Sequence, residues 1–171
     1  MHLDLSDSDL IIRSLNEPRA FTELSARHGA AVRDYLGKRT GRATADRLTL
    51  ATFSLAFRHR ERHQPRSDNA RSWFLGIATD LLNRDARRRV PWSHEATEPS
   101  EDRRRDLALT RALAGLSKRD RDLVCLKTLG GLTSIEVARA VGASTAKVET
   151  RLNVLEPRVG GVSSQAVGQR V

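Results

Sequence analysis

The sequence predicts an all-α protein built from two small helical domains. Apolar residues recur at three- and four-residue spacing along most of the chain, and no stretch alternates convincingly with a period of two. A polar stretch from Val90 to Asp106 contains two prolines and separates two such regions. Cys125 is the only cysteine, which excludes a disulfide framework and a cysteine-based metal site.

The pattern divides the 171 residues into five segments. We expect an N-terminal extension (1–16), a first helical domain (17–90), a flexible linker (91–106), a second helical domain (107–160) and a tail (161–171). The N-terminal residues are acidic and lack the pattern of a signal peptide, and no apolar run approaches membrane-spanning length. We therefore expect a cytoplasmic protein without membrane insertion.

Three helices are expected in the first domain. The first helix carries its apolar face on Phe21, Leu24, His28, Val32, Tyr35 and Leu36. It is broken by the polar stretch around Gly41, and a second helix spans roughly Ala43 to Arg58. A third helix runs to about Arg89, and core packing is the expected role of Trp73 and Phe74 near its start.

Positive charge is concentrated between the second and third helices and along the third. The net charge of +9 favours a polyanionic partner such as nucleic acid, although a solvated arginine-rich surface fits the composition equally well. Arginines beside aromatic side chains are what a single-stranded DNA site requires. The residues expected to contact a DNA strand are Arg58, Arg60, His63, Arg66, Asn69, Arg71, Arg84, Arg87 and Arg88.

The second helix is apolar on nearly all sides. Leu50, Phe53 and Phe57 form one stripe, and a second stripe is formed by Leu48, Ala51 and Leu55. A helix of this kind is either fully buried in its own domain or covered by a partner, and the pattern leaves both interpretations open.

The second domain contains a pattern typical of a helix-turn-helix. Thr133 and Glu136 have the spacing of a capping box, and Gly142 can adopt the left-handed conformation that ends a helix. Ser144 is placed to cap the next helix. The buried side of the pair is expected at Val137, Ala138, Val141, Val148 and Leu152. The alternative is an ordinary helical hairpin.

In a helix-turn-helix, the N-terminal residues of the second helix enter the major groove. Here these residues are Ser144, Thr145, Ala146, Lys147, Glu149, Thr150 and Arg151. Lys147 and Arg151 suit a phosphate or a guanine, whereas Glu149 can accept from cytosine but repels phosphate. Because the rest of the helix has little positive charge, we expect it to bind DNA weakly when alone.

The order of these elements resembles that of the extracytoplasmic-function (ECF) sigma factors, within the sigma-70 superfamily. The resemblance covers roughly Phe21 to Val159. Sigma region 2 is matched by "FTELSARHGAAVRDYLGKRTG", "ADRLTLATFSLAF" and "ARSWFLGIATDLLNRDARRR". Region 4 is matched by "ALAGLSKRDRDLVCLKTLGGLTSIEVARAVGASTAKVETRL". The resemblance implies a protein that binds core RNA polymerase and directs it to promoters.

The resemblance also implies roles for individual segments. The second helix would dock on the clamp of the largest polymerase subunit, through Asp46, Arg47, Leu50, Ala51, Phe53 and Ser54. The arginine-rich loop would capture the −10 element, and the second domain would read the −35 element and meet the polymerase flap. An anti-sigma partner is implied as well. Arg47, Leu50, Ala51 and Glu149 depart from the usual family pattern.

Two other functions remain to be weighed. A helix-turn-helix regulator that binds DNA without initiating transcription would have no use for the second apolar stripe of the docking helix. An enzyme has little support, because the sequence has no phosphate-binding glycine loop and no nucleophile elbow. Only His59 and His63 share a helix face at ligand spacing, so no catalytic residue, metal or cofactor is expected.

Overall fold

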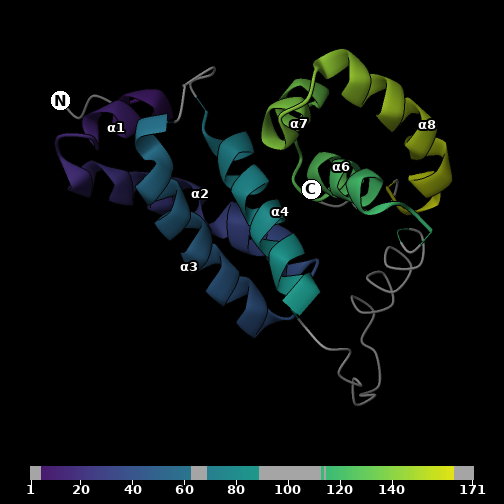
Figure 1. Cartoon of the computed structure of the whole chain (residues 1–171), viewed down its shortest axis with the longest axis horizontal. Helices are drawn as coiled ribbons and strands as arrows, with labels where there is room; N and C mark the ends of the chain where they lie inside the picture. The colour runs from purple at the N-terminus through teal and green to yellow at the C-terminus, as the bar shows by residue number, and fades with distance from the viewer. Residues whose placement is uncertain (1–4, 63–68, 89–112, 114, 164–171) are drawn as a thin grey trace, which may run out of the picture. The chain divides into compact units, whose positions relative to one another are not determined.

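The computed structural model describes residues 5–62, 69–88, 113 and 115–163, and all regular structure in these ranges is helical (Figure 1). The predicted all-α fold is confirmed. The chain divides into two compact units, Met1–Arg88 and Arg89–Val171, here called the N-unit and the C-unit. None of the described helices is both long and apolar enough to cross a bilayer.

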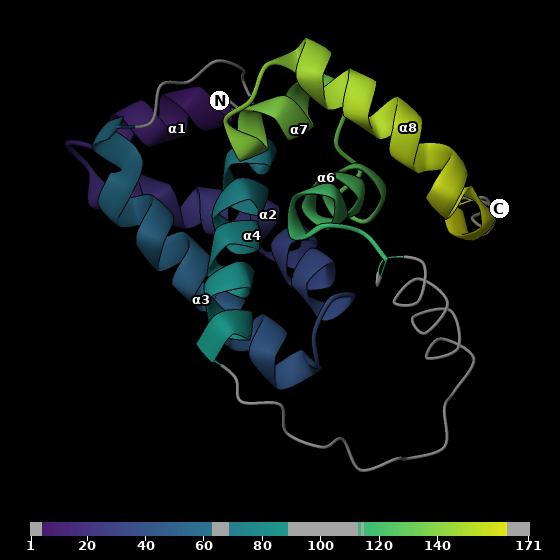
Figure 2. The same ribbon diagram turned by 45° about the vertical axis from the view of Figure 1, so that its right-hand side comes forward.

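The N-unit contains four α-helices and two short 3₁₀ turns among its described residues. The helices are α1 (Asp7–Arg13), α2 (Phe21–Gly37), α3 (Arg42–His59) and α4 (Arg71–Arg88), and the turns are η1 (Pro18–Ala20) and η2 (Arg60–Arg62). α2, α3 and α4 pack side by side (Figure 2). The three expected helices are therefore present, and residues assigned to an extension contain α1.

The N-unit core is assembled around the ring of Phe74. The predicted buried face of α2 is confirmed at all six positions, from Phe21 to Leu36. The Phe74 ring is fully buried, and its centroid lies 4.9 Å from that of Phe53 and 6.3 Å from that of Phe21. Core packing is thus confirmed for Phe74, whereas its neighbour Trp73 is half-buried.

A buried carboxylate joins α1 to the rest of the N-unit. Asp7 is 6% exposed, and its Oδ2 atom lies 2.6 Å from Nε2 of His28 on α2. The same oxygen accepts a hydrogen bond of 2.8 Å from the backbone N–H of Ala70, the residue preceding α4. N–H groups at the start of a helix have no intrahelical acceptor, so this bond satisfies one of them. α1 is therefore an integral part of the N-unit.

The described helices of the C-unit are α6 (Lys118–Thr128), α7 (Ser134–Val141) and α8 (Thr145–Ser163). α6 begins at a Ser117 cap, whose hydroxyl oxygen accepts from the backbone N–H of Asp120. The three helices bury an apolar core that includes Leu123, Leu126, Val137, Ala138, Val148, Leu152 and Leu155. Cys125 is 1% exposed in the same core, as its apolar sequence context predicts.

Candidate nucleic-acid interface

The α7–α8 pair has the local geometry that the sequence predicts. The Thr133 hydroxyl accepts from the N–H of Glu136 at 3.3 Å, and the Glu136 carboxylate accepts from the N–H of Thr133 at 2.8 Å. Gly142 ends α7 with φ at +64°, a left-handed conformation that is strained for residues with a Cβ. The capping box and the glycine turn are both confirmed.

The first turns of α8 separate a buried side from an exposed side. Val148 and Leu152 are 2% exposed and point into the C-unit core, as predicted. The candidate DNA-contacting residues Ser144, Ala146, Lys147, Glu149, Thr150 and Arg151 are exposed, and Thr145 is half-exposed. The structure therefore presents this set on the surface, with a lysine, a glutamate and an arginine within five residues.

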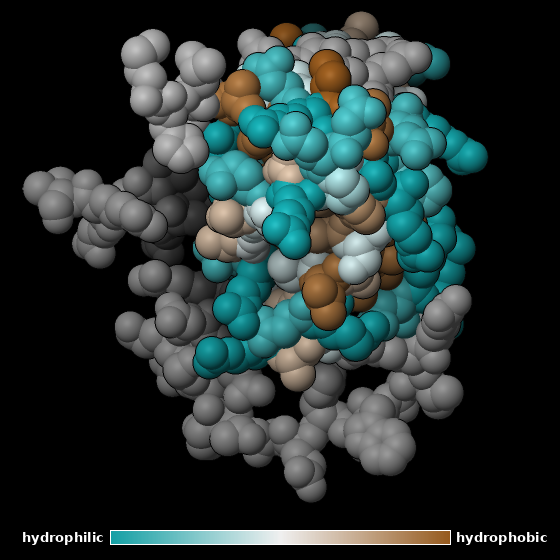
Figure 3. Space-filling model, turned by 90° about the vertical axis from the view of Figure 1, so that its left-hand side faces the viewer, coloured by the Kyte–Doolittle hydropathy of each residue, from teal (hydrophilic) through white to brown (hydrophobic). Residues whose placement is uncertain are grey.

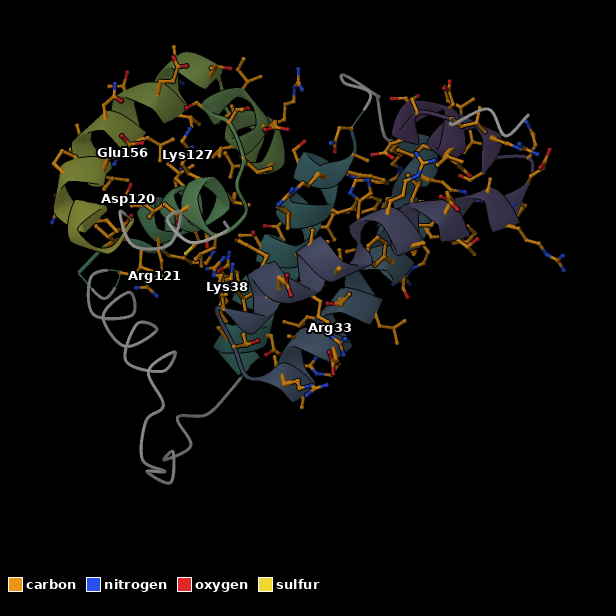
Figure 4. All side chains as sticks on the ribbon, turned by 180° about the vertical axis from the view of Figure 1, so that it is seen from behind. Arg33, Lys38, Asp120, Arg121, Lys127 and Glu156 are labelled. Atoms are coloured by element: carbon orange, nitrogen blue, oxygen red, sulfur yellow. The ribbon has the colours of Figure 1, made fainter. Side chains whose placement is uncertain are left out.

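Arg151 is bound to an acidic residue of the same unit. Its Nε and Nη2 atoms donate to the two carboxylate oxygens of Asp120 on α6, each at 2.6 Å. Asp120 lies on α6 beside α8 in Figure 4. The hydrogen bond from Arg151 lowers the pKa of Asp120 to about 2, against the effect of burial and with help from Ser117. The carboxylate is consequently ionised at neutral pH, and it raises the pKa of Arg151.

This ion pair borders a groove of about 440 Å³ within the C-unit. Apolar and charged side chains both line the groove, which is bordered by Ser117, Arg119, Asp120, Leu123, Val141, Ala143, Lys147, Val148 and Arg151. The groove therefore lies between the start of α6 and the start of α8, beside the helix expected to contact DNA.

The candidate DNA-contacting residues of the N-unit fall at two opposite ends of the helix pair α3–α4. Arg47 near the start of α3 forms an ion pair of 2.6 Å with Asp85 near the end of α4, so the two helices run antiparallel. Arg58 therefore lies at one end, and Arg84 and Arg87 lie towards the other. The 13-residue separation of Arg71 and Arg84 along α4 corresponds to roughly 20 Å at 1.5 Å per residue.

Residues at the first end, where α3 ends and α4 begins, differ in how firmly they are held. Arg58 is exposed, whereas Arg60 donates to the carbonyl oxygens of Phe57 and Ser14 and stacks 3.9 Å over the Phe57 ring. The side-chain oxygen of Asn69 accepts from the N–H of Arg71 at 2.8 Å and so helps to cap α4. His63, Arg66 and the Arg88 side chain lie outside the described residues.

The charged residues of the candidate docking helix α3 form ion pairs inside the N-unit. Asp46 is bound by Arg33 of α2, which projects beside α3 in Figure 4. The hydrogen bond from Arg33 lowers the pKa of Asp46 and raises that of Arg33. Arg47 is bound by Asp85. These contacts give both residues a structural role in addition to the docking role implied by the resemblance.

The apolar stripe of Leu50, Phe53 and Phe57 does not face outward as a unit. Phe53 packs on Phe74 and Phe57 packs edge-on against Phe21 at 5.4 Å, so both belong partly to the core. Leu50 is 71% exposed, Ser54 is exposed and Ala51 is half-buried. Figure 3 shows separate apolar spots among hydrophilic residues on the face in view, not a continuous patch.

Sequence reasoning did not single out two residues that shape these surfaces. Asp7 lay in the expected extension, and its partners Arg27, His28 and Ala70 are 20, 21 and 63 residues away. The spacing of Ser117 and Asp120 is that of a capping box and could have marked Asp120 in the sequence. Its partner Arg151, however, lies 31 residues further along the chain. Among the described residues, no cluster of histidine, cysteine and carboxylate side chains could hold a metal ion.

Comparisons with known proteins agree with this architecture. The sequence matches no protein-family model and no curated protein. The structure matches CnrH, solved in complex with the cytosolic domain of CnrY, with a TM-score of 0.71 and 21% identity over 94% of this chain and 98% of that one. It also matches the sigma factor RpoE of Bartonella quintana, solved with the anti-sigma factor NepR, with a TM-score of 0.63 and 17% identity over 85% and 98%.

The fold is that of an ECF sigma factor. The resemblance predicted from the sequence is thereby confirmed for the fold, over both units and in the same chain order. Within this sigma fold, α3 stands where the docking helix was expected and α8 where the DNA-reading helix was expected.

Proposed function

We propose that the protein acts as an ECF-type sigma factor, which binds core RNA polymerase and directs it to promoters. The observation that carries this proposal is the sigma fold, which extends over 94% of the chain and therefore includes both units. A regulator that only bound duplex DNA would need the C-unit alone. Retention of an entire N-unit of sigma type favours a protein that also meets polymerase and single-stranded DNA.

In this proposal, the outward face of α3 contacts the clamp of the largest polymerase subunit. Arg47, Leu50, Ser54 and Arg58 follow one another at three- and four-residue spacing and are all exposed. Leu50 is the apolar centre of this strip, at 71% exposure. A single exposed leucine can supply about 1.5–3 kcal/mol when a partner covers it, so it is the main candidate contact.

The two DNA elements are assigned to different units. The end of the N-unit around Arg58, Asn69 and Arg71 captures the non-template strand of the −10 element. The exposed side of α8 around Lys147, Glu149 and Thr150 reads the −35 element, and the C-unit also meets the polymerase flap. Catalysis remains with the polymerase, and we assign no cofactor to this chain.

We also propose an anti-sigma partner. RpoE of Bartonella quintana was solved with the anti-sigma factor NepR, and it shares this fold. A protein that covered Leu50 on α3 would block the proposed polymerase contact directly, so this face is where such a partner is expected to act.

The second candidate function is a sigma-like DNA-binding regulator that does not initiate transcription. It is favoured by the state of α3, where Asp46 and Arg47 are occupied by Arg33 and Asp85 within the N-unit. Ionic contacts with polymerase would have to compete with these pairs, which weakens the charged part of docking.

One experiment separates the two functions. The full chain is mixed with core RNA polymerase, the complex is isolated, and run-off transcription is measured from the DNA upstream of the protein's own gene. A sigma factor forms the complex and yields a defined start site that core polymerase alone does not produce. A regulator binds the DNA but yields neither, and that result would contradict the sigma proposal.

A further inference from the structure

In the ion pair with Asp120, Arg151 uses the same two-donor geometry with which arginine binds DNA. Two donors on one edge of the guanidinium meet the two carboxylate oxygens, each at 2.6 Å. Arginine uses the same fork to bind a phosphate, or the O6 and N7 atoms of guanine. Arg151 cannot offer this edge to DNA while Asp120 occupies it.

The two partners differ in mobility and exposure. Asp120 is fixed, because the hydroxyl of Ser117 donates to its Oδ2 at 2.8 Å and accepts from its backbone N–H at 3.2 Å. The side chain of Asp120 is 9% exposed, whereas that of Arg151 is 48% exposed. Arg151 is therefore the partner that can swing away, and its guanidinium is accessible from solvent.

The ion pair with Asp120 changes the net charge on the exposed side of α8. The exposed charges on its first turns are Lys147, Glu149 and Arg151, one acidic and two basic. Asp120 neutralises Arg151, so these four side chains sum to zero. Release of Arg151 leaves this sum unchanged, but it frees a guanidinium that can bind a phosphate, and such a contact favours any duplex by counterion release, whatever its sequence.

We propose that Asp120 is a specificity-determining residue that competes with DNA for the Arg151 guanidinium and so suppresses sequence-independent binding by α8. The inference rests on the proposed DNA-binding role of the C-unit. Asp120 itself does not contact DNA. It decides whether Arg151 contributes a phosphate contact, and it leaves discrimination to Lys147, Glu149 and Thr150.

The test measures the affinity of the full chain for a short random-sequence duplex as a function of salt. Asp120→Asn keeps the shape and the Ser117 contact but removes the charge that holds Arg151. We expect tighter binding and a log–log salt slope steeper by about 0.9, the value for one additional phosphate contact. The ratio of mutant to wild-type affinity then grows about threefold between 200 and 50 mM salt. A purely structural role for Asp120 would not raise the slope.

Matched variants on α8 complete the test. Lys147 and Arg151 are cations four residues apart on one helix, and only Arg151 has the Asp120 partner. We expect Lys147→Gln to weaken duplex binding and to flatten the slope, and Arg151→Gln to cause a smaller change in both, because Asp120 already holds the Arg151 guanidinium in the wild type. In the double variant Asp120→Asn/Arg151→Gln the gain of the single Asp120→Asn variant disappears.

The outcomes distinguish this inference from the proposed function. Equal losses for Lys147→Gln and Arg151→Gln, or an unchanged slope for folded Asp120→Asn, overturn the competition while DNA binding by the C-unit stands. If Asp120→Asn unfolds, the comparison of Lys147→Gln with Arg151→Gln still tests whether Asp120 withholds Arg151 from DNA. Absence of duplex binding by wild type together with binding by Asp120→Asn supports the inference. Absence in both, in folded protein, overturns it along with the DNA-binding role.

Discussion

Each unit buries an aspartate to 6% exposure, and the two carboxylates differ in where their partners lie. Asp7 in the N-unit meets the side chain of His28, which is 9% exposed, and the buried N–H of Ala70, with a longer contact of 3.4 Å to Arg27, whose side chain is 28% exposed. Asp120 in the C-unit meets Arg151, whose side chain is 48% exposed. A carboxylate whose shortest contacts are to interior partners mainly stabilises the fold, whereas one whose main partner lies at the surface can exchange that partner for a ligand. Burial of the acid alone does not reveal this difference.

The largest expected effect comes from removing the interior carboxylate. Asp7→Ala leaves the buried His28 ring nitrogen without its hydrogen-bond partner and the Ala70 N–H without its acceptor, and each such loss costs about 1–3 kcal/mol. We expect the free energy of unfolding of the N-unit to fall by about 2–4 kcal/mol. Denaturant unfolding measures it by Trp73 fluorescence in a Trp92→Phe background, since the chain has two tryptophans.

Asp9→Ala is the matched control on the same helix. Asp9 is exposed and completes the capping box of α1 with Ser6, a contact worth about 1 kcal/mol. A smaller loss for Asp9→Ala than for Asp7→Ala is expected. Equal losses would mean that the Asp7 contacts only cap α1, and the contrast between the two buried aspartates would fail.

The next effect concerns the surface that the N-unit presents to a partner. Leu50→Glu places a charge at the centre of the outward strip of α3. We expect affinity for core polymerase to fall about 10- to 100-fold, which corresponds to the binding free energy lost when one leucine is no longer buried. Because Leu50 is 71% exposed, the unfolding free energy should change by less than about 0.5 kcal/mol. Competition binding with fluorescently labelled wild-type protein measures the affinity.

Ile12→Glu provides the control for docking. Ile12 is 55% exposed in the same unit but lies on α1. It should leave polymerase affinity unchanged if the contact is specific to α3. A comparable loss for both variants would indicate that any new charge on the N-unit weakens binding, and it would remove the argument for Leu50.

A smaller effect is expected from the surface-linked carboxylate. Asp120→Asn should lower the stability of the C-unit by about 1 kcal/mol, because Arg151 is half exposed and its pair with Asp120 is partly screened by water. The folded pKa of Asp120 is lowered to about 2, so its contribution is complete above the usual aspartate range and is lost as pH falls through about 2. The stability difference between wild type and Asp120→Asn should therefore shrink between about pH 4 and pH 2.

Hydrogen exchange of α6 and α8 amides measures this difference at each pH. At neutral pH the reactivity of Cys125, the only cysteine and 1% exposed, gives an independent measure of C-unit opening. A stability difference that stays constant down to pH 2 would show that Asp120 does not act through its charge.

Local features of the fold could be predicted from the sequence because they depend on nearby residues. The six buried positions of α2 follow from its helical period, and the Thr133 capping box and the Gly142 turn span only a few residues each. The outward face of α3 could not be predicted in this way. α2 and α4 both pack on α3, so apolar residues occur on several sides of this helix. Their spacing therefore does not show that Phe53 and Phe57 point inward while Leu50 points outward.

The candidate sites depend on contacts between distant residues, which no local pattern encodes. Arg151 looked available because its partner Asp120 is 31 residues away. Arg58 and Arg87 seemed to form one basic cluster because the sequence between them is rich in arginine. The antiparallel course of α3 and α4, which the Arg47–Asp85 pair marks, places them at opposite ends.

The smallest expected effect tests that separation. If the end of the N-unit around Arg58 captures a DNA strand, Arg58→Gln removes one phosphate contact and should flatten the salt slope for bubble DNA by about 0.7, the value for single strands. Arg87→Gln removes the same charge at the other end of α4 and should leave the slope unchanged. Both side chains are exposed, so neither variant is expected to alter folding.

The C-unit supplies the complementary control. Lys147→Gln on α8 should flatten the slope for duplex DNA. It should leave any preference of the full chain for bubble over duplex DNA intact, because capture of the single strand is assigned to the N-unit. Titration of all three variants against duplex and bubble probes of equal length separates these contributions. A slope change for Arg87→Gln equal to that for Arg58→Gln would show that the far end of α4 also meets DNA. A loss of bubble preference in Lys147→Gln would move strand capture to the C-unit.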